Sequence, residues 1–168
     1  MSGHSKWSQI KHQKNITDQK RGQLFSKLSK LISLATRKGA DPKSNTELRN
    51  AIEQARSFNI PNNNIERAVK RISDKSAAQL EELLVEAIAS GNVALKIRAI
   101  TNNRNRTIAE IKNILNENSA KIVPPGSISW MFNQPISASR ETRERINKLL
   151  EALDNNNDVE EITTNLVS

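Results

Sequence analysis

The sequence contains no cysteine, and only five of its 168 residues are aromatic. The lack of cysteine excludes disulfides, zinc fingers and cysteine nucleophiles, and it fits a reducing compartment. No apolar run approaches the roughly 20 residues that span a bilayer, and the N-terminal residues lack the apolar stretch of a signal peptide. We therefore expect a soluble cytoplasmic protein of one ordinary domain or two small ones, with a core of Leu, Ile, Val and Ala.

Recognisable catalytic motifs are missing as well. The only histidines, His4 and His12, have no acid nearby in the sequence to orient either of them as a general base. Neither a P-loop nor a GxGxxG, GxSxG or HExxH motif is present. Glu81, Glu82 and Glu86 are candidates for paired carboxylates or a metal site, but acids on such a leucine-rich segment are typical of solvated surface. We expect no enzyme activity, no metal and no cofactor.

Positive charge is concentrated in the first half of the chain. Residues 1–75 carry 16 Lys and Arg against six Asp and Glu, whereas residues 76–168 carry ten against 12. The first 38 residues hold nine basic side chains and one acid, Asp18. Such a block indicates a polyanionic partner. We favour nucleic acid over a membrane, because membrane binding needs large apolar anchors opposite the cations and Trp7 and Ile10 alone make a poor anchor. A basic face kept for solubility is the alternative.

Residues 1–16 show no helical periodicity and are predicted to be a flexible basic tail. Within it Trp7 combines a stacking ring with nearby cations, as single-stranded nucleic-acid binders do. The cations are Lys6, Lys11, His12 and Lys14. Alternatively, Trp7 and Ile10 fold back as core, which leaves the lysines able to bind phosphate.

Residues 17–75 are predicted to form a basic three-helix domain. Apolar residues at 3.6-residue spacing predict a first helix over about 18–38 that ends near Gly39. Most of the basic side chains of this helix are expected on the side opposite its apolar stripe. They are Lys20, Lys27, Lys30, Arg37 and Lys38; Arg21 is the exception. A capping box of Ser44 and Glu47 predicts the start of a second helix.

The third predicted helix of this domain opens at Pro61 and the asparagines that follow it. Its apolar residues are expected inward and its charged residues outward. The outward residues are Glu66, Arg67, Lys70 and Arg71.

Residues 76–168 are predicted to form a small α+β domain. Alternation over Val93–Ile100 indicates a half-buried strand, and the Ser90–Gly91–Asn92 turn suggests Leu83–Ala89 as its antiparallel partner, although a helix over 83–89 competes. Further elements are expected in this order: a helix capped by Thr107 and Glu110, a strand over Ile128–Phe132, a helix around Ile146–Leu153 and a strand near Val159–Ile162. The order β-β-α-β-α-β suits a sheet with helices on one face.

Arg104 and Arg106 form a second candidate binding site. Both precede Thr107, so the free N–H groups of the predicted helix N-terminus would assist them in binding an anion. The alternative is turn chemistry with salt bridges to Glu110 or Glu117.

Several motifs in order resemble the YebC-type family. They are Gly3–Trp7, Ile10–His12, Asp18 with Lys20–Gly22, Leu24–Leu28, Asp41–Pro42, Leu48–Arg49, Ile60–Pro61, Asn64–Ala68, Val93–Leu95, Asn103–Thr107, Ala109–Glu110, Gly126–Ser127 and Trp130–Phe132. Together they cover most of the chain, which makes them far more specific than any one motif.

The resemblance implies an N-terminal helical domain and two α+β domains, the last inserted within the middle one. It also implies a regulator of gene expression, since some members are DNA-binding transcriptional regulators and others are translational activators that engage the ribosome. This sequence departs from the family where it passes from Phe132 almost directly to the closing segment, so we expect the inserted domain to be missing near 134–140. Asn102, where relatives tend to have Asp, and the less glycine-rich Ala89–Asn92 are smaller departures.

The sequence therefore predicts a non-enzymatic nucleic-acid-binding regulator that acts on ribosomal RNA as a translation factor. A DNA-binding transcriptional regulator is one alternative, and a protein-interaction module with a steering tail is another. Nothing in the sequence specifies an oligomeric state. The predicted nucleic-acid contacts are His4, Lys6, Trp7, Lys11, His12, Lys14, Lys20, Arg21, Lys27, Lys30, Arg37, Lys38, Arg104 and Arg106.

Overall fold

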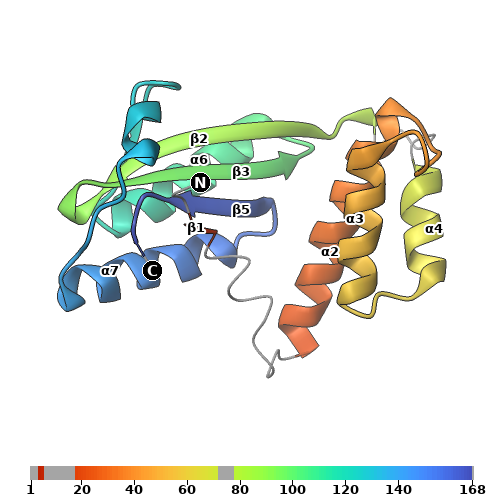
Figure 1. The fold of residues 1–168 in the computed structure, drawn as a ribbon, viewed down its shortest axis with the longest axis horizontal. Helices are drawn as coiled ribbons and strands as arrows, with labels where there is room; N and C mark the ends of the chain where they lie inside the picture. Colours follow the sequence, from red (N-terminus) through yellow and green to blue (C-terminus); the bar gives the residue numbers. More distant parts are fainter. Residues whose placement is uncertain (1–3, 6–17, 72–77, 168) are drawn as a thin grey trace. The chain divides into compact units, whose positions relative to one another are not determined.

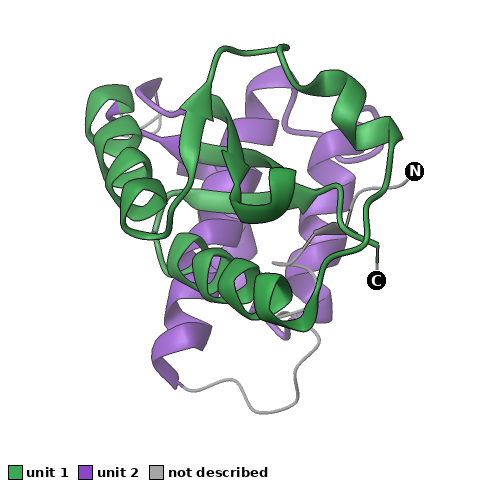
Figure 2. Cartoon of the chain, turned by 90° about the vertical axis from the view of Figure 1, so that its left-hand side faces the viewer, with its two compact units in different colours: residues 1–14, 82–99, 104–168 green, residues 15–81, 100–103 purple. Residues whose placement is uncertain are grey.

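The computed structural model describes residues 4–5, 18–71 and 78–167. The chain divides into two compact units, shown in Figure 2. We call residues 15–81 and 100–103 the helical unit, and residues 1–14, 82–99 and 104–168 the sheet unit.

Among its described residues, the helical unit contains three α-helices, as predicted (Figure 1). They are α2 (Asp18–Ala35), α3 (Thr46–Ser57) and α4 (Asn62–Lys70), and a 3-10 turn, η1 (Thr36–Lys38), continues α2 to Gly39. Each helix turns its apolar stripe inward: the buried set includes Leu28, Ile32, Leu48, Ala55, Ile65 and Ala68. The Ser33 hydroxyl donates to the Ala68 carbonyl oxygen at 2.9 Å, which fixes α4 against α2.

Asn45, and not the predicted Ser44–Glu47 capping box, caps α3. The Asn45 side-chain oxygen accepts from the Leu48 N–H at 3.1 Å, and its amide nitrogen donates to the carbonyl oxygens of Ala35 and Gly39, each at 2.8 Å. Asn45 is buried, so its amide satisfies backbone groups at the end of one helix and the start of the next.

A five-stranded sheet in the order β1-β5-β3-β2-β4 organises the other unit. Its strands are β1 (His4–Ser5), β2 (Glu81–Ala89), β3 (Val93–Thr101), β4 (Lys121–Val123) and β5 (Val159–Thr164). The pairs β1–β5, β3–β5 and β2–β4 are antiparallel, and η3 (Ser90–Asn92) joins β2 to β3. The α+β class and the predicted β2–β3 hairpin are thus confirmed.

His4 and Ser5 are paired with Thr164 and Thr163 of β5. These two residues are therefore in a strand and not in the unstructured tail that the sequence predicts. The rest of that tail lies outside the described residues.

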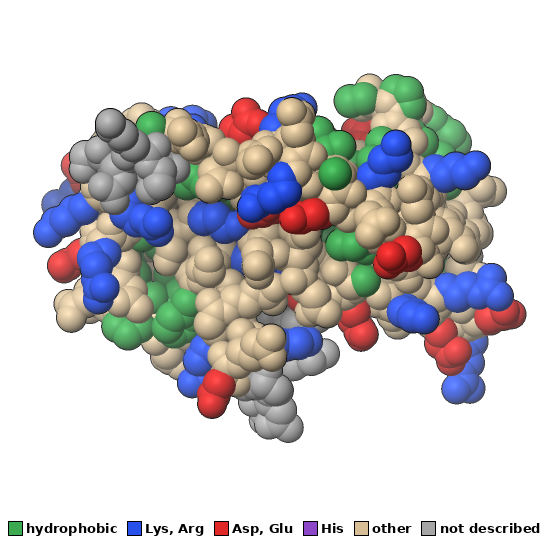
Figure 3. All heavy atoms as spheres, turned by 180° about the vertical axis from the view of Figure 1, so that it is seen from behind, with side chains coloured by type: hydrophobic (Ala, Val, Ile, Leu, Met, Phe, Trp, Pro, Cys, Tyr) green, Lys and Arg blue, Asp and Glu red, His purple; other side chains and the backbone are tan. Residues whose placement is uncertain are grey.

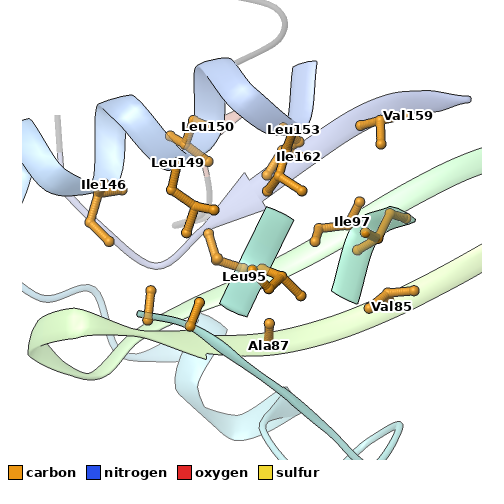
Figure 4. Close-up of a cluster of buried hydrophobic side chains, with 14 of the residues drawn as sticks. Val85, Ala87, Leu95, Ile97, Ile146, Leu149, Leu150, Leu153, Val159 and Ile162 are labelled. Atoms are coloured by element: carbon orange, nitrogen blue, oxygen red, sulfur yellow. The ribbon is translucent and has the colours of Figure 1, made fainter. Parts of the chain in front are cut away.

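The helices α6 (Arg104–Glu117) and α7 (Arg140–Asp154) cover one face of the sheet. Their apolar side chains meet alternate residues of β2, β3 and β5, as Figure 4 shows for Leu95, Ile97, Leu149 and Ile162. This burial pattern confirms the predicted sheet with helices on one face.

The prediction of a strand over Ile128–Phe132 is wrong. Ser129–Phe132 lie in the 3-10 helix η4 (Ser129–Asn133). The strand that follows β3 in the chain is β4, which starts seven residues before the predicted strand. Ile128 and Met131 are buried against Ala94, whereas Trp130 is 59% exposed. Since Ala94 alternates with the helix-facing Val93 and Leu95, η4 packs on the opposite face of the sheet.

Residues 134–139 connect η4 directly to α7. Within this connection Ile136 bridges to Leu166, which follows β5. This is the place where the sequence predicts that the family's inserted domain is missing.

Candidate nucleic-acid interface

The exposed cations of α2 and η1 lie at the two ends of this helical segment. Lys20 and Arg21 are exposed in the first turn, and Arg37 and Lys38 are exposed in η1. Lys38 forms an exposed ion pair with Glu47, Nζ to Oε1 2.7 Å. The rise of 1.5 Å per residue separates Lys20 from Arg37 by about 25 Å, so the two ends present positive charge at well-separated points.

Lys27 and Lys30, in the middle of α2, are less accessible than predicted. Lys27 is only 1% exposed, so in this structure its ammonium group does not reach a partner at the surface. Lys30 is half-buried, and its Nζ donates to the Ile100 carbonyl oxygen at 3.3 Å. The helical projection was misleading here because it shows which side of the helix a residue occupies but not what covers that side.

Arg104 and Arg106 lie within the first turn of α6 and not before it, since the helix begins at Arg104. Thr107 is therefore not the predicted cap: it is fully buried, and its hydroxyl donates to Asp158 Oδ2 at 2.7 Å. Arg106 donates to the same oxygen, Nη2 to Oδ2 2.7 Å, and its Nε lies 3.8 Å from Glu110 Oε1. Of the salt bridges considered for these arginines, the one from Arg106 to Glu110 is present.

The predicted tail contacts Lys6, Trp7, Lys11, His12 and Lys14 lie outside the described residues. His4 contributes its backbone to β1.

Sequence reasoning placed Arg67, Lys70 and Arg71 outward but did not include them in a site. All three are exposed on or just after α4, and they line a cavity together with Asn64, Ala68 and, from α2, Ser29. Their spacing in the sequence shows a basic helix face, but only the packing of α4 on α2 creates the hollow.

The helical unit is strongly basic at its surface. Its described residues 18–71 carry twelve Lys and Arg against five Asp and Glu, and ten of those twelve cations are exposed. Figure 3 shows Lys and Arg side chains in blue spread over the left of the view, on the helical unit. Among the residues that the structure describes, no group of three metal-binding side chains is found. No described helix is long and apolar enough to cross a membrane.

A basic three-helix unit joined to a sheet covered on one face by two helices defines the class of protein. The chain belongs to the TACO1/YebC family. Residues 5–75 match the family's N-terminal domain, and residues 80–135 match its second and third domains. The helix α7 and the strand β5 lie beyond the second match.

Several curated relatives are named probable transcriptional regulatory proteins. The chain is 51% identical to one from Chloroflexus aurantiacus over 137 residues, which cover 80% of this chain and 54% of the relative. Relatives from Halothermothrix orenii and Treponema pallidum are 47% identical over 136 residues and are covered to 54% and 56%. The chain thus spans about half the length of the curated relatives it matches.

Among solved structures, the chain is similar to the crystal structure of a conserved hypothetical protein from Aquifex aeolicus. The TM-score is 0.82 at 27% sequence identity, and the match covers 95% of this chain and 96% of that one.

Proposed function

We propose that this protein is a nucleic-acid-binding regulator of gene expression that binds phosphates through its helical unit. The observation that carries the proposal is the exposure of ten of the twelve cations in residues 18–71. Because these residues carry twelve cations against five acids, their net positive charge attracts a polyanion, and the polyanion releases counterions on binding. The names of the relatives support a role in gene regulation.

We propose RNA of the ribosome as the partner, with the protein acting as a translation factor. The exposed cations of α2 and η1 flank a central stretch in which Lys27 is buried and Lys30 is bonded to a carbonyl oxygen. A recognition helix in a DNA major groove needs several base-reading side chains along one continuous face, and the basic side chains of α2 do not form such a face. Phosphate contacts at separated points position a protein on an irregular RNA surface.

A DNA-binding transcriptional regulator is the second candidate. It is favoured by the printed names of the relatives, which are transcriptional regulatory proteins. The two candidates predict opposite preferences between RNA and duplex DNA.

Binding of the full chain to ribosomes, RNA hairpins and random duplex DNA, each titrated over salt concentration, tests the proposal. Ribosome binding that survives physiological salt while duplex binding collapses supports the translational role. Tight duplex binding with sequence discrimination overturns it in favour of the second candidate. No binding to any of the three overturns a nucleic-acid role and leaves a protein-interaction module.

Charge-reversal variants identify the surface. Lys20→Glu with Arg21→Glu is expected to weaken binding at least about tenfold and to lower the salt slope by about 1.4 to 1.8 for two lost phosphate contacts. The matched control is Lys112→Glu with Lys148→Glu, since both residues are exposed on the helices of the sheet unit. Equal losses in the two pairs would show that only total charge matters.

A further inference from the structure

A cavity of about 520 Å³, open to solvent, lies between α2 and α4, and its described lining residues all belong to the helical unit. Its described lining consists of Ser29, Asn64, Arg67, Ala68, Lys70 and Arg71. This volume lies within the range of small-molecule sites and exceeds what one phosphate group fills.

The packing of the two helices fixes the walls of the cavity. Ala68 is 2% exposed and is tied to α2 by the Ser33 hydroxyl, 2.9 Å from the Ala68 carbonyl oxygen. Within the lining, Arg67 Nη2 donates to Asn64 Oδ1 at 3.2 Å. This bond orients the guanidinium group and leaves the Asn64 amide nitrogen as a donor. The lining therefore combines the small side chains of Ser29 and Ala68 with the long hydrogen-bond donors of Arg67, Lys70 and Arg71.

The chemistry of the lining favours an anion. The residues given above include two arginines and one lysine but no carboxylate, and Ser29 and Asn64 add neutral donors. A guanidinium group donates two parallel hydrogen bonds to phosphate, and this geometry distinguishes it from a diffuse positive charge.

We propose that this cavity receives a nucleotide of a bound RNA strand, with its phosphate held by Arg67, Arg71 and Lys70. The proposal rests on the proposed function, since it names the site at which the helical unit holds one nucleotide of the strand. It adds a contact on α4 that the α2 cations do not provide. A free nucleotide offers the same phosphate chemistry, so the test includes one.

The first test compares two double variants that lose the same charge, one with both substitutions in the cavity lining and one with both outside it. Arg67→Gln with Arg71→Gln is expected to weaken binding of a single-stranded RNA oligonucleotide at least about tenfold and to lower its salt slope by about 1.4. Arg49→Gln with Arg56→Gln removes the same charge from exposed positions of α3, outside the lining, and is expected to cost less than about threefold. Equal effects of the two pairs would overturn the proposal.

The second test fills the cavity without changing charge. Ser29→Phe places a ring in the lining, whereas Ser26→Phe places it at an exposed position of the same helix. Weaker binding for Ser29→Phe alone supports the proposal, and wild-type binding by both variants contradicts it. Urea midpoints of all variants show whether each is folded.

A third arm identifies the source of the phosphate and separates this proposal from the proposed function. Uridine monophosphate and inorganic phosphate are titrated into wild-type protein and into the Arg67→Gln/Arg71→Gln variant. Mononucleotide binding that requires both arginines, with oligonucleotide binding unaffected by their loss, would overturn the strand assignment. If Lys20→Glu/Arg21→Glu abolishes RNA binding while the cavity variants bind normally, the cavity proposal fails and the proposed function stands. If the wild-type protein binds no RNA at all, both fail.

Discussion

Arg106 in the first turn of α6 and Asp158 immediately before β5 are joined by an ion pair, Nη2 to Oδ2 2.7 Å. The same carboxylate oxygen accepts the hydroxyl of buried Thr107 at 2.7 Å, and Asn156 donates to Glu110 at 2.8 Å. These bonds fasten the start of α6 to the loop between α7 and β5. They give the Asn103–Thr107 motif a structural role. We therefore assign Arg106 to the stabilisation of α6 and keep Arg104 as the candidate contact to nucleic acid.

Asp158→Ala is expected to destabilise the protein by about 2–3 kcal/mol, because it removes the carboxylate that accepts from both the buried Thr107 hydroxyl and Arg106. Arg106→Ala is expected to cost only about 1 kcal/mol, since its side chain is 46% exposed and its ion pair is partly screened. Urea unfolding of both single variants and the double variant measures the coupling between them. RNA affinity should change less than about threefold in Arg106→Ala. A tenfold loss of affinity without loss of stability would return Arg106 to the binding surface.

Helical periodicity predicted the helical unit well because each of its helices has one apolar side that it buries. Leu28 and Ile32 of α2 and Leu48 and Ile52 of α3 are all buried as the spacing indicates. The strand β3 was equally predictable, since Val93–Ile100 alternates regularly. Its partner β2 was less so, because the composition of residues 83–89 also suits a helix. Lys27 shows the limit of the method: a projection of one helix does not contain the surfaces that pack on it.

The wrong prediction of a strand over Ile128–Phe132 has a different cause. Ile128, Trp130 and Phe132 alternate in sequence, but the buried residues of this segment are Ile128 and Met131, three apart, which is the period of a 3-10 helix. The true strand, β4, has three residues and is too short to show a period. The cavity on α4 was not predictable because it needs Ser29 from another helix.

Asn45→Ala is expected to lower the free energy of unfolding by about 2 kcal/mol. The substitution removes the cap of α3 and leaves two carbonyl oxygens, those of Ala35 and Gly39, without their side-chain donor. Ser44→Ala is the matched control, because the exposed Ser44 hydroxyl bonds only to the Asp41 carbonyl oxygen at 3.3 Å among the interactions described. Its expected cost is below about 0.5 kcal/mol. Chemical denaturation measures the free energy of unfolding of both variants. A larger loss of stability for Ser44→Ala than for Asn45→Ala would support the Ser44–Glu47 capping box that the sequence suggests.

Gly91→Ala is expected to destabilise the sheet unit by about 1–2 kcal/mol. Gly91 has φ +75°, and an added Cβ would lie 2.9 Å from Thr142 Cγ2 on α7. Gly22→Ala provides the contrast: its added Cβ would meet nothing within 4 Å, and alanine favours a helix interior, so it should stabilise by about 0.5–1 kcal/mol. Thermal unfolding of both variants measures these changes in stability. Adding Thr142→Ser to Gly91→Ala removes the methyl group and should recover only the part of the loss due to crowding.

Lys27→Met is expected to leave the salt dependence of RNA binding nearly unchanged. Because the Lys27 side chain is only 1% exposed, it does not contact a phosphate and so does not displace a counterion when RNA binds. Lys20→Met removes an exposed cation of the same helix and should lower the slope of log K against log salt by about 0.7. Binding of one oligonucleotide at four or more salt concentrations gives both slopes, and urea midpoints confirm that each variant is folded. A drop of about 0.7 for Lys27→Met would mean that Lys27 reaches phosphate in the complex, and hence that whatever covers it here moves away on binding. An unchanged slope for Lys20→Met would instead remove the first turn of α2 from the interface.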